Sequence, residues 1–193
     1  MNDKNDSAKI ISYYSCPNID LKEKSDRLNY YYNLYKKNPD STNYCVGFFK
    51  YFPCNFKEIY EIYVYQEAVD GKKEKLPLNE NGYYHIRELF NNLDCVSDTI
   101  YYQKLINISI GGFWKADDIN FFHKGLTDKV INNIDLVLYS LSNKNDVEIE
   151  SFFKFLFDGP HPPRKIDINL LRIKDKDKRV FEIMEKAHYE LQK

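Results

Sequence analysis

The stretch from Asp146 to Pro163 constrains the fold more than any other part of the sequence. Its apolar residues recur at spacings of three and four, as they do on one face of a helix. They are Ile149, Phe152, Phe153, Leu156 and Phe157. Asp146 is predicted as the N-cap, because its carboxylate can accept a hydrogen bond from a first-turn N–H. Gly159 and Pro160 end the helix, since glycine accepts a positive φ and proline cannot donate to the helical ladder.

Composition favours helices in the rest of the chain as well. Only 7 Gly and 7 Pro interrupt 193 residues, and long stretches with helical spacing lie between them. A chain of this length can form one substantial core. We therefore predict an all-α single domain over residues 25–193, built from roughly eight or nine short antiparallel helices in an irregular or hairpin-repeat-like array. Residues 1–24 are predicted as a poorly ordered lead-in.

Caps and breakers predict several of the helix boundaries. Asn38-Pro39 ends the first long helix, because the residue before a proline disfavours helical geometry. Asn55 and Glu58 have the spacing of a capping box at the start of another helix. Gly111-Gly112 is predicted to break the chain between two helices, and the polar residues 66–81 are predicted as its longest loop.

Charge and hydropathy exclude some classes of partner. The net charge of -1 provides no overall field for nucleic acid or anionic membrane. No apolar run is long enough for a transmembrane segment. The first residues are polar and do not form a signal peptide. The expected location is cytoplasmic for the sequence as it stands, and periplasmic or lipid-anchored if an export signal has been removed.

The cysteines lie far apart, with no closely spaced pair of the kind that zinc sites use. They are Cys16, Cys45, Cys54 and Cys95. No metal and no cofactor are predicted. The plain interpretation is free, mostly buried thiols in a reducing compartment. In an exported protein the even count would allow one or two disulfides, and the sequence leaves both interpretations open.

Asp158 and His161 form the first candidate pair for chemistry. A carboxylate and an imidazole three residues apart could bind a metal or act as acid and base. The structural alternative, which we favour, is that Asp158 accepts backbone N–H bonds in the turn while His161 caps the carbonyl end of the helix.

Asp117 and Asp118, which follow Trp114, form the second candidate. They could supply oxygen ligands, but an N-cap acid followed by a first-turn acid explains both. His85 and His123 lie on or beside apolar faces, and we interpret them as satisfied or half-exposed histidines. No catalytic set is recognisable. We therefore predict no catalytic residues, and five binding candidates: Trp114, Asp117, Asp118, Asp158 and His161.

Tyrosine is unusually abundant. The chain holds 17 Tyr residues, and its aromatic-rich helices carry more of them than one buried face can take up. Exposed tyrosine supplies contact area at low entropic cost, which suits a protein–protein surface. A biased base composition is the alternative explanation.

Several segments between residues 45 and 165 resemble a family of small, uncharacterised, helical bacterial proteins. The segments are Phe49-Lys50-Tyr51-Phe52-Pro53, Ile62 to Tyr65, Tyr84-His85-Ile86, Lys104 to Asp117, and Phe155-Leu156-Phe157-Asp158-Gly159-Pro160-His161-Pro162. The resemblance implies an export signal in some members and a role as an immunity factor in interbacterial competition.

Two functions follow as expectations. The first is a non-enzymatic protein that binds and neutralises a toxin or effector, with no nucleic acid partner and an undetermined oligomeric state. The second is an envelope hydrolase that uses Asp158 and His161.

Overall fold

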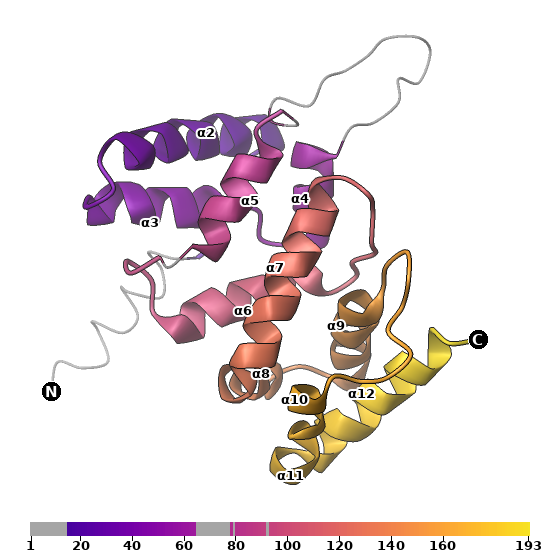
Figure 1. Ribbon diagram of the computed structural model, residues 1–193. Helices are drawn as coiled ribbons and strands as arrows, with labels where there is room; N and C mark the ends of the chain where they lie inside the picture. Colours follow the sequence, from indigo (N-terminus) through magenta and orange to yellow (C-terminus); the bar gives the residue numbers. More distant parts are fainter. Residues whose placement is uncertain (1–14, 65–77, 79, 92) are drawn as a thin grey trace, which may run out of the picture.

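The computed structural model describes residues 15–64, 78, 80–91 and 93–193, and every regular element within them is a helix (Figure 1). The helices are α2 (Leu21–Lys37), α3 (Thr42–Tyr51), α4 (Phe56–Tyr63), α5 (Gly82–Phe90), α6 (Asp98–Ser109), α7 (Asp118–Asn132), α8 (Ile134–Leu141), α9 (Asp146–Phe157), α10 (Ile168–Leu171), α11 (Ile173–Lys176) and α12 (Lys178–Glu190). The prediction of an all-α chain is confirmed.

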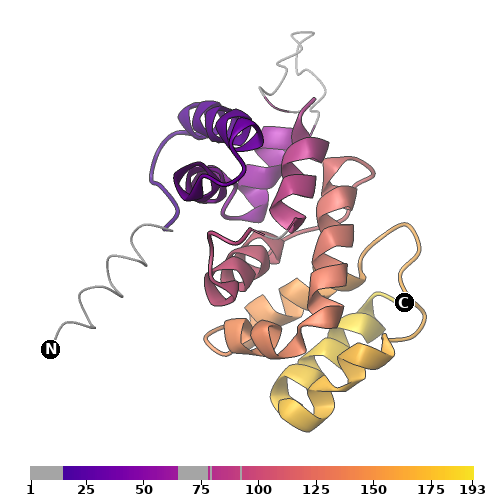
Figure 2. The same cartoon turned by 60° about the vertical axis from the view of Figure 1, so that its left-hand side comes forward.

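The array is irregular. Helix α7 runs through the middle of the molecule, where it packs against α5 and α9 and also touches α4, α8 and α10 (Figures 1 and 2). The pair α2–α3 lies at one end, and α10, α11 and α12 lie at the other. Apart from α2–α3, the most closely packed pairs are not consecutive in sequence: α9 with α12, α6 with α8, and α5 with α7. The core is therefore built by helices that are distant along the chain.

Most predicted breaks between helices are confirmed. Helix α2 ends at Lys37, directly before Asn38-Pro39, and Gly111 has a φ of +78° just after α6. Helix α2 begins before residue 25, because Asp20 accepts a hydrogen bond from the Glu23 N–H at 2.9 Å and caps it. Residues 1–14 of the predicted lead-in, and most of the predicted loop at 66–81, lie outside the described residues.

The start of α9 differs from the prediction by one residue. Asn145, not Asp146, is the N-cap, and it forms a full capping box with Glu148: each side chain accepts the other residue's N–H at 3.0 Å. Asp146 instead pairs with Arg179 of α12 at 2.6 Å. The reciprocal pair satisfies two free backbone donors, whereas Asp146 as a cap would satisfy one.

Helix α9 supplies the centre of the core. Phe152, Phe153 and Phe155 have no solvent-exposed surface. The Phe155 ring lies 5.7 Å from that of Phe56 in α4 and 6.2 Å from that of Phe122 in α7. The same aromatic face thus joins three helices, and Gly159, with a φ of +152°, turns the chain away after it.

Two disulfides tie the N-terminal half together: Cys16–Cys54 and Cys45–Cys95. The first joins the segment before α2 to the connection between α3 and α4. The second joins α3 to the connection between α5 and α6. The interpretation of these cysteines as free thiols is wrong. Spacing in the sequence carries no information about which thiols the helix packing brings together.

Candidate functional site

The exit of α9 brings together three of the predicted site residues: Trp114, Asp158 and His161. Asp158 Oδ2 accepts the backbone N–H of Trp114 at 2.7 Å, and its Oδ1 accepts the N–H of Gly159 at 2.8 Å. Both carboxylate oxygens are thus engaged by the backbone, as the structural interpretation of Asp158 expects. His161 lies exposed in the following turn, and His123 Nε2–H is the group that donates to a last-turn carbonyl of α9, that of Leu156, at 3.1 Å.

Asp117 and Asp118 begin α7. Asp117 caps the helix by accepting the Ile119 N–H at 3.1 Å. Asp118 packs against Gly82 at the start of α5, so closely that a Cβ on residue 82 would lie 2.1 Å from its Oδ2. Burial, with the charge of Asp117 as a smaller cause, raises the pKa of Asp118 to about 6. Asp117 therefore caps α7, and Asp118 serves the α5–α7 packing.

His85 is buried between α2, α4 and α5. Its Nδ1 lies 3.3 Å from the Tyr63 hydroxyl, and its ring lies 4.3 Å from that of Tyr32. Its Nε2 has no hydrogen-bond partner among the described residues. Burial lowers the pKa of His85 to about 4, so the imidazole is neutral at pH 7. The expectation of a satisfied or half-exposed histidine is wrong for His85. Its side chain is fully buried, and only one of its two ring nitrogens has a hydrogen-bond partner within the described part of the chain.

We expect His85 to make the protein less stable in mild acid. Its pKa in the folded state, about 4, lies below the usual value of 6.5, so its stabilising contribution is complete above about pH 6.5 and is lost as the pH falls towards 4. The loss reaches about 3 kcal/mol at most. Urea unfolding between pH 7 and pH 4 measures it, and His85→Phe should flatten the dependence.

Asp118 provides the control, because its pKa is shifted in the opposite direction. A raised carboxyl pKa means that protonation of Asp118 favours the folded state as the pH falls through about 6. Asp118→Asn should therefore steepen the loss of stability in acid. An unchanged slope in His85→Phe would contradict the assignment of the acid sensitivity to His85.

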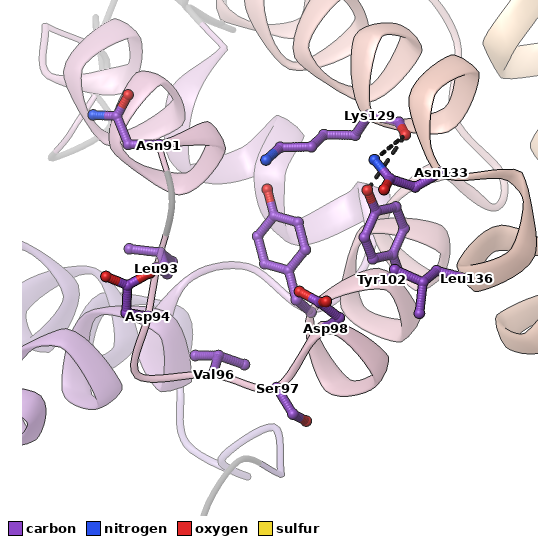
Figure 3. A pocket seen from close by; sticks show the side chains of 11 residues that line it. Asn91, Leu93, Asp94, Val96, Ser97, Asp98, Tyr102, Lys129, Asn133 and Leu136 are labelled. Carbon is purple, nitrogen blue, oxygen red and sulfur yellow. Dashed lines mark hydrogen bonds between the residues drawn. The ribbon is translucent and has the colours of Figure 1, made fainter.

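A polar hollow of about 510 Å³ lies between α6, α7 and the connection before α6 (Figure 3). We name it the Asp98 pocket. It is lined by Asn91, Leu93, Asp94, Val96, Ser97, Asp98, Tyr101, Tyr102, Lys129, Asn133 and Leu136. One wall is fixed by the Lys129 carbonyl, which accepts from the Tyr102 hydroxyl and from Asn133 Nδ2, both at 3.3 Å.

A second hollow, the α5–α7 groove, has a volume of about 220 Å³. It is lined by Tyr83, Ile86, Arg87, Phe90, Asn91, Phe121, Lys124, Gly125 and Asp128. Gly125 lets the two helices approach, since a Cβ there would lie 2.3 Å from the Phe90 ring. Asn91 lines both hollows, so the groove and the Asp98 pocket meet at the end of α5.

Neither hollow contains any of the five residues predicted from the sequence. The groove joins residues 83–91 to residues 121–128, and the pocket joins residues 91–102 to residues 129–136. The sequence analysis noted that tyrosine is abundant in the chain, but it did not single out Tyr83 or Phe121 as binding residues.

The fold and these sites define an all-helical protein with a polar pocket and an aromatic groove. No family model, curated protein or solved structure matches the chain. None of the described helices has both the length and the apolar character needed to cross a membrane. In the described part of the chain, no three His, Cys, Asp or Glu residues come together as a metal site.

Proposed function

We propose that this protein is a non-enzymatic binding protein that holds a protein partner on the α5–α7 groove. The observation that carries the proposal is an exposed aromatic cluster. Tyr83 and Phe121 are 38% and 42% exposed, and their rings meet edge to face at 4.7 Å. Tyr84, which is 55% exposed, packs against Tyr83. Aromatic side chains at a groove are typical of the residues that dominate the free energy of protein–protein binding.

The charged residues of the groove specify the partner further. Arg87 and Lys124 are exposed at its edge, and Asp128 is the acid that lines it. The groove therefore carries a net positive charge beside its aromatic surface. A partner segment with an apolar anchor and flanking acidic residues would be complementary to it, because rim charges of opposite sign accelerate association and select against wrong partners.

The candidate partner is a bacterial toxin or effector, and the protein would act as its immunity factor. This step rests on the segments of residues 45–165 that resemble uncharacterised helical bacterial proteins, for which a role as immunity factors is the expectation. The two disulfides fit it too, since disulfides persist in oxidising compartments such as the bacterial envelope. The hydrolase alternative has less support, because both oxygens of Asp158 accept backbone N–H bonds and His161 lines neither hollow.

The double variant Tyr83→Ala/Phe121→Ala should lose binding while keeping its fold. Removal of two contact aromatics is expected to cost about 2–4 kcal/mol of binding free energy, or roughly 30-fold to 1000-fold in Kd. The measurement is co-expression with toxin candidates encoded beside the gene, scored by growth rescue, followed by titration of the purified pair.

The matched control is Tyr139→Ala/Tyr189→Ala. These two tyrosines are also exposed, but they lie on α8 and α12, away from the groove. They should leave rescue and Kd unchanged. Full protection by the Tyr83→Ala/Phe121→Ala variant would contradict the groove as the binding site. Failure of the parent protein to rescue growth from any candidate would contradict a toxin as the partner.

A further inference from the structure

The Asp98 pocket contains charges of both signs that do not pair with each other. Asp94 and Asp98 line it from the connection before α6 and from the first turn of α6, and Lys129 enters it from α7 (Figure 3). Among the described residues, none of these three side chains takes part in an ion pair. Three charges without an ion pair in the described ranges therefore surround one hollow and are available to a ligand.

Hydrogen bonds from two tyrosines to the backbone hold the wall behind these charges. The Tyr101 hydroxyl donates to the Leu89 carbonyl at 3.0 Å, and the Tyr102 hydroxyl donates to the Lys129 carbonyl. Both tyrosines are buried, so their hydroxyls bond to the backbone of the wall and do not face a ligand in the hollow. The Lys129 ammonium lies 5.5 Å from the centre of the Tyr101 ring, which holds it by a cation–π contact without neutralising it.

The sign and placement of the charges select the ligand. A simple anion attracted by Lys129 would also meet two carboxylates, and a simple cation attracted by the carboxylates would meet the ammonium. A ligand that carries one group of each sign can bond to Asp98 and Lys129 together, and charge-assisted hydrogen bonds to such groups are the strong ones. A volume of about 510 Å³ lies in the range of small-molecule sites.

From this arrangement we propose that the Asp98 pocket binds a small zwitterion of the α-amino-acid class. The ligand's ammonium group lies with Asp98, and its carboxylate lies with Lys129. The amides of Asn91 and Asn133 border the remaining space, where the side chain of the ligand fits. The pocket is separate from the α5–α7 groove except at Asn91, so this inference does not depend on the protein-binding role.

The test is calorimetric titration of the full-length protein with each of the twenty free amino acids, into the millimolar range. At least one is expected to bind with one-to-one stoichiometry. Its methyl ester, which keeps only the positive charge, and its N-acetyl form, which keeps only the negative charge, should each bind about tenfold more weakly or worse. Asp98→Asn and Lys129→Gln, which remove each charge and keep a polar side chain, should each weaken binding of the free amino acid to a similar degree.

The matched control is Asp128→Asn, which changes a neighbouring exposed acid of α7 that lines the groove and not the pocket. It should bind the amino acid as the parent does. Absence of binding for all twenty overturns the proposal. So does an ester that binds as tightly as its parent amino acid, since the pocket would then be a cation site, and so does binding that both pocket variants retain.

Discussion

Replacement of Phe153 by alanine is expected to lower the free energy of unfolding by about 3–5 kcal/mol. The Phe153 ring has no exposed surface and packs on α9 between Phe152, at 5.0 Å, and Phe157, at 6.1 Å. Truncation loses the transfer free energy of the ring and leaves a cavity that the surrounding helices cannot close, because α9 is held by α12 on one side and by α6 and α7 on the other. Urea unfolding followed by circular dichroism measures the change.

Val147→Ala on the same helix is the control. Val147 is 77% exposed, so its truncation should change the unfolding free energy by less than about 0.5 kcal/mol. Together the two variants test which face of α9 is buried. A loss below about 1 kcal/mol for Phe153→Ala would contradict the packing of α9 described above.

Removal of the Cys45–Cys95 bridge is expected to cost about 4 kcal/mol. The cysteines are 50 residues apart, and a crosslink that closes so long a loop restricts the unfolded chain strongly. The variant is Cys45→Ala/Cys95→Ala, and the measurement is thermal or urea unfolding without reductant. Cys16→Ala/Cys54→Ala, which opens a loop of 38 residues, should cost nearly as much.

Reductant distinguishes loss of the crosslink from loss of packing. Dithiothreitol should destabilise the parent protein by more than it destabilises either double variant, because the parent has two bridges to lose and each variant has one. A parent protein whose unfolding curve is the same with and without reductant would show that the cysteines are not bridged in solution.

Local sequence determined the helices and most of their ends. Asn38-Pro39 and Gly111-Gly112 stop helices through their own backbone preferences, and the aromatic face of α9 is set by spacings of three and four residues. These effects act over four residues or fewer, so a single sequence displays them. The error at the start of α9 was also local: Asn145 and Glu148 form a stronger, reciprocal cap than Asp146 could.

Tertiary structure decided everything that joins distant segments. The partners of Cys45 and Cys16 lie 50 and 38 residues away, and the Asp98 pocket needs α6 and α7 to place Asp98 opposite Lys129. Among the predicted site residues, Asp158 accepts the N–H of Gly159 beside it and the N–H of Trp114, 44 residues earlier, so the second contact also depended on the fold. The order in which helices pack is set by the summed burial of their apolar faces, a property of the whole chain that no short segment contains.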